Sequence, residues 1–600
     1  MSAARPRSYI SPLLLGLGVY VHRLFGSRQV VDLLSALGCS VSYHEVQRFE
    51  ASAVMRSEES KQLDGDALIQ YVYDNADHNA ATLDGSGSFH VLGGIECTSP
   101  STLVPKTSRI ERLVNLPSAE NLADKTRVKI LRFCKTSHDM SCVLKDLKSL
   151  EKNENISVML TLDSLWLFGY AISVNPVSSW NGYMQAGMEG SNCLPYHQTH
   201  VRALPFIDSS PSNPDTIYTA LVDAERRSVE CGQKYCYFTG DLPTYVKARE
   251  IVTHMQEKQI FMNVVVRLRG VHLLMNFLGA VGYIMSGSGI EELLSTIYAR
   301  GSVDNMMNAK YYSRAIRGHF LIHAALGKLI FLRLDLQDVA ENEVTALFKK
   351  FQSNQIDAIA AASDKTAIKL MQLLSKATTE ISSYGPTAKL WTQYFELISL
   401  VKLFIRAERT GDWELHLSCI ASMLPIFHAA GHLKYAKYAH VYVQDMMQLK
   451  YNMPKNEYAR FSQGGFTVRR NEWYWSGCWT DLIIEQELMR SIKSSGGLTR
   501  GRGLTESTAT QFLSSQPACL EIMALIENFS GKRAENSEQH KEMRDTRMAR
   551  DKKDVDTLYK WLEIRNPFIC SPDHLVSLTT GVVAENSVNC HILLGKLENR

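Results

Sequence analysis

The sequence predicts an α/β fold in which a mixed sheet is interrupted by a large all-helical insertion and preceded by a helical segment. Three observations carry this prediction. Strand-like and helix-like patterns alternate within residues 63–286, apolar residues have helical spacing throughout most of 287–470, and residues 1–62 contain three helical runs. A chain of 600 residues is long enough for two to four units that each bury a core.

The composition is that of a globular protein. Hydrophobic residues make up 45% of the chain and charged residues 21%, which excludes global disorder. The formal net charge is only +3, so any nucleic-acid surface must be a local patch. The 12 cysteines include no Cys-x-x-Cys pair, which favours reduced thiols. No apolar run approaches the roughly 20 residues of a membrane span, so we expect a nuclear or cytoplasmic protein without a membrane partner.

Residues 1–62 are predicted to form a helical N-terminal module. The first helix covers 12–25, Ser27 can cap a second helix that ends at Gly38, and Ser42 can cap a third. This order is also that of helix-turn-helix DNA readers, although the turn between the second and third helices is longer than usual. The module is therefore expected to be a helical packing unit or a helix-turn-helix.

Residues 63–286 are predicted to form the first part of the sheet core. An alternating apolar run ends at Asp74, and a polar turn leads to a second strand at 88–95. Residues 97–200 fit neither pattern and are treated as an insertion. Further strands are predicted at 203–208, 235–239 and 263–268, and helices at 214–229, 243–255 and 272–285. The order β-β-β-α-β-α-β-α is typical of an α/β protein with a mixed sheet.

The rest of the chain is predicted to be mostly helical. Residues 287–470 are expected to form a helical insertion, because apolar residues recur at three- and four-residue spacing without strand-like alternation. Residues 471–600 are expected to complete the core. They contain an acidic helix around Glu485, a glycine-rich basic loop, a mixed-charge helix at 532–555 and a C-terminal tail.

Three acidic residues occupy positions that suit a metal-dependent nucleic-acid enzyme. Asp74 and Asp241 each follow a predicted strand, and Glu485 lies within a predicted helix. This is the carboxylate layout of the RNase H-like fold. Three carboxylates that meet repel one another unless cations neutralise them, and two Mg²⁺ or Mn²⁺ ions would also hold the attacking and leaving oxygens of a phosphodiester. Asp77 is a rival for the first acid, and each acid alone also fits an ordinary cap or surface charge.

Two sequence features are candidates for phosphate contact. His272 opens the helix at 272–285, where it suits either a phosphate contact or an ordinary hydrogen bond at a helix start. The basic loop contains Lys493, Arg500 and Arg502 among glycines, whose backbone N–H groups can approach a phosphate closely. The loop lacks the Gly-Lys-Ser/Thr ending of a P-loop, so nucleotide hydrolysis is not predicted.

Several short blocks of the sequence occur in a characteristic order. They are Asp74-Asn75, Thr239–Thr244, Gly270–Leu278, Arg409–His416, Gly431–Tyr435, Asp481–Glu485 and Gly496–Gly503. Their combination resembles Kyakuja–Dileera–Zisupton and Plavaka-type DDE transposases and uncharacterised transposase-derived proteins of invertebrates. The resemblance implies an RNase H-like core with Asp74, Asp241 and Glu485 as metal-binding acids. Leu242 departs from it, because these transposases usually carry glutamine there, and no clear N-terminal zinc or SAP-like module is found.

The sequence therefore predicts a transposase-derived DNA-processing protein that hydrolyses or transfers a phosphodiester with a DDE carboxylate triad. Asp74 and Asp241 would bridge two Mg²⁺ or Mn²⁺ ions, and Glu485 would complete the second site. DNA is the expected partner, and a homo-oligomer is compatible with the sequence. The principal alternative is a catalytically inactive domesticated transposase that acts as a DNA- or protein-binding scaffold. A weaker alternative is a helical scaffold with no nucleic-acid role.

Overall fold

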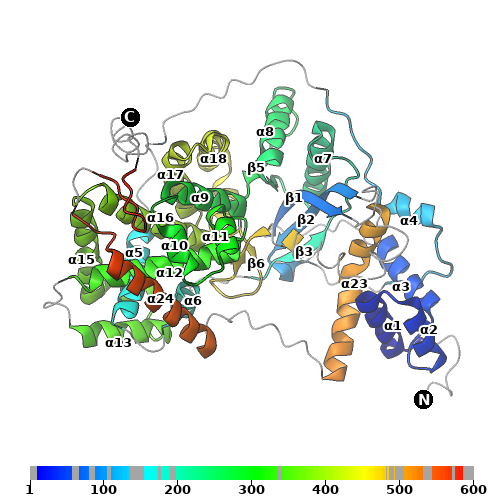
Figure 1. Ribbon diagram of the computed structural model, residues 1–600. Coiled ribbons are helices and arrows are strands. Elements are labelled where there is room, and N and C mark those ends of the chain that lie inside the picture. Colours follow the sequence, from blue (N-terminus) through cyan, green and yellow to red (C-terminus); the bar gives the residue numbers. More distant parts are fainter. Residues whose placement is uncertain are drawn as a thin grey trace.

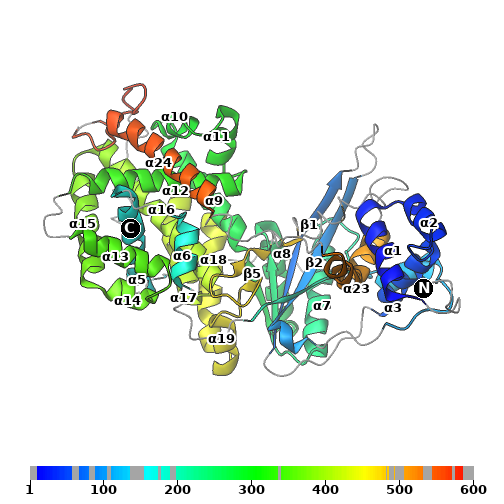
Figure 2. The same cartoon turned by 90° about the horizontal axis from the view of Figure 1, so that it is seen from below.

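The protein has a mixed α/β architecture in which a five-stranded sheet lies between two helical regions (Figure 1). The view from below shows the same arrangement, with the larger helical region on one side of the sheet and the N-terminal helices on the other (Figure 2). The computed structural model describes residues 10–56, 67–79, 88–104, 110–134, 147, 154–172, 177–188, 197–334, 340–480, 483–484, 492, 506–531, 544–570 and 574–584.

The three predicted N-terminal helices are confirmed. Ser27 caps the second helix by accepting a hydrogen bond from the Val30 N–H at 3.3 Å, and Ser42 accepts one from the Glu45 N–H at 3.4 Å at the start of the third. Both serines act as the sequence predicts, because a hydroxyl at this position satisfies a free N–H of the first turn. The helices are α1 (Pro12–Phe25), α2 (Arg28–Ala36) and α3 (Tyr43–Arg56).

A C-terminal helix that the sequence analysis missed joins this N-terminal group. Helix α23 (Glu506–Ser530) packs against α1, α3 and the short helix α4 (Ala119–Thr126). Figure 2 shows α23 beside α1. The contact is close, because a Cβ at Gly16 would lie 2.7 Å from the side chain of Ile526. The N-terminal helices therefore share a core with a segment almost five hundred residues away in the chain.

The sheet has the strand order β3-β2-β1-β4-β5. The pairs β3–β2 and β2–β1 are antiparallel, whereas β1–β4 and β4–β5 are parallel. Outside the segment 97–200, the predicted order of strands and helices within 63–286 is confirmed, whereas that segment contributes helices between β2 and β3 that were not predicted. The strands are β1 (Leu68–Asn79), β2 (Ser88–Ser99), β3 (His200–Ala203), β4 (Cys236–Gly240) and β5 (Val264–Leu268).

The predicted end of the first strand is wrong. β1 continues past Asp74 to Asn79, because it forms a long antiparallel hairpin with β2 in which Asp74 pairs with Gly93. The pairing of β1 with β4, in contrast, stops at Val72. Asp74 therefore lies inside a strand, at the point where only the hairpin with β2 continues.

The third strand is also shifted from its prediction. The sequence predicts it at 203–208, whereas β3 ends at Ala203. Pro205 has no N–H to continue a ladder of hydrogen bonds, which ends the regular strand. Ile207 then rejoins the sheet through an isolated antiparallel bridge to Leu92.

The two faces of the sheet are covered by different elements. Helices α7 (Pro214–Glu230) and α8 (Leu242–Gln256) pack on one face, where Tyr73 stacks on Phe238 with ring centroids 5.0 Å apart. On the other face, Ala76 is buried in a cluster with residues of α23. Side chains alternate between the faces of a strand, so neighbouring residues of β1 belong to different cores.

The predicted helical insertion is confirmed as a helical region, and it includes helices from outside 287–470. Helices α5 and α6 come from the segment 97–200, which was predicted to be an insertion. Helix α24 corresponds to the predicted mixed-charge helix. Residues 532–543 of that prediction lie outside the described residues. Figure 1 shows α5 and α24 among the helices of this region. Its helices are α5 (Glu154–Ala171), α6 (Trp180–Met188), α9 (Gly270–Met285), α10 (Ile290–Ser295), α11 (Arg300–Met307), α12 (Tyr312–Phe331), α13 (Glu341–Gln352), α14 (Ala358–Ser363), α15 (Lys365–Ser382), α16 (Pro386–Thr410), α17 (Trp413–Ala429), α18 (Leu433–Asn452), α19 (Lys455–Ser462) and α24 (Asp545–Arg565).

A two-stranded ribbon that was not predicted links this region to the sheet. Strands β6 (Val468–Arg469) and β7 (Gly477–Cys478) pair antiparallel, and the Thr199 N–H donates to the carbonyl of Arg469 at 3.0 Å. In the part of the chain that the structure describes, no helix is both long and apolar enough to cross a bilayer.

Candidate functional site at the carboxyl ends of the parallel strands

Three charged residues lie at one level of the sheet. β1 and β4 pair in parallel as far as Val72 and Thr239, and Asp74 and Asp241 each lie two residues beyond this pair. Arg269 follows β5 directly, as Asp241 follows β4. Neighbouring strands are about 4.8 Å apart, so the two predicted acids share one edge of the sheet although the chain separates them widely.

Asp74 is a buried carboxylate whose two oxygens both have partners. The residue is 5% exposed, and its Oδ1 accepts a hydrogen bond from the Asn75 N–H at 2.7 Å. Oδ2 lies 2.7 Å from Nη1 of Arg269 in an ion pair. Arg269 is 1% exposed and also donates to the carbonyl of Tyr73. Removing one partner of such a buried pair typically costs about 3–5 kcal/mol, because the other charge stays buried.

Asp241 caps helix α8. Its Oδ1 accepts a hydrogen bond from the Thr244 N–H at 3.0 Å, and its backbone is extended with φ −64° and ψ 176°. A negative charge is favourable at this position, because the first N–H groups of a helix and its dipole point toward it. Asp241 therefore acts as an ordinary helix cap, and the capping hydrogen bond holds its carboxylate at the strand end.

Two buried apolar clusters flank Asp74 on its own face of the sheet. Val72 and Ile484 belong to one cluster, while Ala76 and Ile492 belong to the other. Asp74 lies between Val72 and Ala76 on the same face, because alternate residues of a strand point the same way. Ile484 and Ile492, the described residues on either side of 485–491, therefore belong to the clusters that include the two neighbours of Asp74 on this face.

The remaining predicted residues are only partly described. His272 lies half-buried in the first turn of α9, and its carbonyl accepts a hydrogen bond from Nδ2 of Asn276 at 2.9 Å. The backbone of Asp77 pairs with His90 in the hairpin, and its side chain is outside the described part. The predicted residues that lie outside the described residues altogether are Glu485, Lys493, Arg500 and Arg502.

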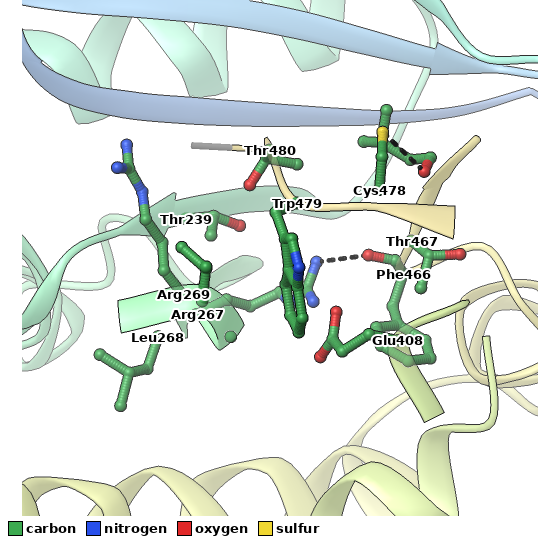
Figure 3. A pocket seen from close by; sticks show the side chains of 13 residues that line it. Thr239, Arg267, Leu268, Arg269, Glu408, Phe466, Thr467, Cys478, Trp479 and Thr480 are labelled. Carbon is green, nitrogen blue, oxygen red and sulfur yellow. Dashed lines mark hydrogen bonds between the residues drawn. The ribbon is translucent and has the colours of Figure 1, made fainter. Parts of the chain in front are cut away.

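A small cavity adjoins the strand ends, as Figure 3 shows. Arg267, Arg269, Glu408 and Trp479 are among the residues that line it. Gly270 permits this arrangement, because a Cβ there would lie 2.9 Å from Oε1 of Glu408 and 2.8 Å from the ring of Trp479. The end of α16 and the β7 segment thus approach the start of α9 closely.

Glu408 heads a chain of buried polar groups behind the cavity. Its Oε1 lies 2.6 Å from Nδ1 of His416, and Nε2 of His416 lies 3.1 Å from the hydroxyl of Tyr442. Burial raises the pKa of Tyr442 to about 12, so the phenol keeps its proton at neutral pH. Glu408, His416 and Tyr442 therefore form a row of polar groups that leads from the wall of the cavity into the buried interior.

Two residues of this region were missed by the sequence analysis. Arg269 directly follows a strand, as Asp241 does, but it was not predicted because only acidic residues at strand ends were considered. Glu408 directly precedes the block Arg409–His416 that carries part of the resemblance. Both could have been found by asking which charged residues end a buried element next to a motif.

The type of ligand at the strand ends suits a hard divalent cation, because Asp74 and Asp241 supply carboxylate oxygens. The charge of Asp74, however, is already balanced by Arg269. Within the described residues, no group of three or more His, Cys, Asp or Glu side chains is placed to hold a metal ion.

Comparison with known proteins yields one match. Neither a curated protein nor a solved structure matches the chain. A family described as "Domain of unknown function (DUF8702)" matches residues 179–595, which include Asp241, Arg269 and Glu408 but begin after β1 and Asp74. Because the match covers more than half of the sequence, the chain belongs to the DUF8702 family.

Proposed function

We propose that this protein is a transposase-derived DNA-processing protein that hydrolyses or transfers a phosphodiester with the acids at its strand ends. The observation that carries the proposal is the shared level of Asp74 and Asp241 on neighbouring parallel strands. The mixed sheet, with β2 antiparallel to β1 and with β1, β4 and β5 parallel, supports the predicted mixed-sheet core.

In this proposal, the protein holds the reacting phosphodiester at the carboxyl edge of the sheet. Asp74 and Asp241 would hold Mg²⁺ or Mn²⁺, and Glu485 would complete the site from the segment that follows Ile484. Such ions would supply charge stabilisation for the attacking and leaving oxygens. The start of α9 with His272 and the loop containing Lys493, Arg500 and Arg502 would contact backbone phosphates.

The test compares DNA cleavage by the wild-type chain and by Asp241→Asn. The substrate is an end-labelled DNA duplex in the presence of Mn²⁺. Asparagine keeps the oxygen that caps α8 but removes the charge, so folding is retained. We expect wild-type cleavage and a loss of roughly 100-fold or more in Asp241→Asn, the scale seen when a group acting in the transition state is removed.

The control is Asp364→Asn. Asp364 is half-buried and caps α15, where it accepts a hydrogen bond from the Thr366 N–H at 2.8 Å. Figure 1 shows α15 on the side of the helical region that faces away from the sheet. The Asp364→Asn variant should cleave DNA at the wild-type rate. Equal cleavage by Asp241→Asn and wild type would contradict the assignment of the site.

The alternative is a catalytically inactive domesticated transposase that binds DNA or protein. The buried pair of Asp74 with Arg269 favours it, because this pair neutralises the first acid without a metal ion. A wild-type chain that binds duplex DNA with a steep salt dependence, yet does not cleave it, would support this alternative. Salt dependence is diagnostic because phosphate contacts release counterions.

A further inference from the structure

The ion pair of Asp74 and Arg269 lies at the position where the proposed function needs a divalent cation. A role for Arg269 in holding Asp74 ready for a cation rests on that proposed function. Nη1 of Arg269 is 2.7 Å from Oδ2 of Asp74, and the guanidinium also donates to the carbonyl of Tyr73. The side chain of Arg269 is fully buried and that of Asp74 is 7% exposed.

A backbone hydrogen bond fixes the position from which Arg269 makes this pair. Arg269 belongs to the turn between β5 and α9, and its backbone N–H donates to the carbonyl of Gly240 at 3.1 Å. The guanidinium therefore reaches across β4 from a fixed backbone position to contact β1. Gly93 stands opposite Asp74 in the hairpin and contributes no side chain, whereas Arg269 contacts this carboxylate directly.

A guanidinium and a divalent cation compete for the same oxygen. Each needs a lone pair of Oδ2, and each repels the other at the short distances of a shared carboxylate. In a buried site this repulsion is screened less than at the surface. Arginine does not lose its proton in proteins, so the competition persists at any physiological pH.

We propose that Arg269 is the resident counter-charge of Asp74, and that a divalent cation binds this carboxylate only by displacing the guanidinium. Arg269 holds Asp74 in its binding orientation while no cation is bound, and it lowers the affinity of the site for Mg²⁺ or Mn²⁺. It is a positioning residue that acts through Asp74.

The experiment measures Mn²⁺ binding to the full chain by the electron paramagnetic resonance signal of free Mn²⁺. Arg269→Gln removes the charge and keeps a side chain that can donate to the carbonyl of Tyr73. We expect Arg269→Gln to bind one Mn²⁺ at least tenfold more tightly than wild type. We expect the gain to disappear in the double variant Asp74→Asn, Arg269→Gln, because the carboxylate has been removed.

A matched control distinguishes the site from the general loss of a buried arginine. Arg317 on α12 pairs with Asp551 and Asp554 of α24, with Nη2 2.6 Å from Oδ2 of Asp554. Arg317→Gln also removes a guanidinium from two carboxylates, although Asp551 keeps Arg547 as a partner, and no cation is proposed at this place. It should leave the affinity of the tightest Mn²⁺ site unchanged.

Unchanged or weaker Mn²⁺ binding by Arg269→Gln would overturn the inference. If Arg269→Gln does not fold, Arg269→Lys provides the test, because lysine lacks the planar guanidinium that contacts both Asp74 and the carbonyl of Tyr73. Lysine keeps the repelling charge, so the gain expected for Arg269→Lys is smaller than tenfold. A Mn²⁺ affinity of Arg269→Lys above that of wild type supports the inference, and an affinity equal to that of wild type contradicts it. The DNA cleavage assay of the wild type and Asp241→Asn judges the proposed function separately, so tighter Mn²⁺ binding without cleavage would leave the inference standing alone.

Discussion

At the scale of single residues, some buried polar side chains of the described chain have partners that are distant in the sequence and that the sequence does not display. His319 on α12 is one such residue, since it is 1% exposed and its Nδ1 lies 2.8 Å from the hydroxyl of Tyr394. Burial lowers the pKa of His319 to about 4, because the charged imidazolium would lose its hydration. The neighbouring His323 is also buried, and its pKa is lowered in the same way.

We predict that the free energy of unfolding falls as the pH drops from about 6.5 to about 4. The unfolded chain takes up a proton at the ordinary histidine pKa, whereas the folded chain resists until near pH 4. His319→Gln should therefore flatten this fall by up to about 3 kcal/mol, as measured by urea unfolding at pH 7, 5.5 and 4. His428→Gln, at an exposed position, should leave the slope unchanged. Equal slopes for His319→Gln and wild type would refute the prediction.

At the scale of elements, close helix contacts depend on particular glycines. In α9, Gly282 approaches α11 so closely that a Cβ there would lie 2.1 Å from the carbonyl oxygen of Met307. Gly279, one turn earlier on the same helix, has room, because its nearest neighbour would be His432 at 3.7 Å. The two positions have similar helical geometry and differ mainly in the space around them.

We predict opposite effects for alanine at these two positions. Gly282→Ala should lower the free energy of unfolding by about 1–3 kcal/mol, because the backbone of α11 has to move away. Gly279→Ala should raise it by up to about 1 kcal/mol, because alanine favours the helix more than glycine does. Urea unfolding of both variants checks this, and a loss in Gly279→Ala as large as that in Gly282→Ala would show that the contact with Met307 is not the cause.

The elements themselves could largely be predicted where local signals are strong. The serine caps at Ser27 and Ser42 mark helix starts because the capping hydrogen bond is local. Helix α23 was missed because it contains Pro517, which normally ends a helix, and its apolar residues do not form one clear stripe. The end of β1 was misplaced because its continuation depends on pairing with β2, which a single strand does not reveal.

At the scale of the whole molecule, the candidate site was only half predictable. Asp74 and Asp241 could be placed together, because ends of neighbouring parallel strands meet at one edge. The ion pair of Asp74 with Arg269 could not be predicted, because it depends on β4 lying between β1 and β5. The same limit hid the association of α5 with the helices of 287–470, which joins residues far apart in the chain.

A buried ion pair fastens α5 to this helical region. Nζ of Lys402 on α16 lies 2.6 Å from Oδ1 of Asp163 on α5 and 2.9 Å from Nδ1 of His323. Burial lowers the pKa of Lys402 to about 8 while Asp163 opposes the shift, so the ammonium keeps its proton at neutral pH. Its charge also lies over the ring of Trp166, 4.3 Å from the centroid, which adds a cation–π contact.

We predict that Lys402→Met lowers the free energy of unfolding by about 3–5 kcal/mol, because Asp163 stays buried without its counter-charge. The double variant Lys402→Met, Asp163→Leu should recover most of this loss, since it leaves no uncompensated charge. Lys328→Met breaks the more exposed pair with Asp556, with 2.8 Å between Nζ and Oδ1, and should cost less than about 1 kcal/mol. Chemical denaturation of the three variants provides the measurement. A double variant no more stable than Lys402→Met would mean that packing around Lys402, and not charge balance, joins α5 to the helical region.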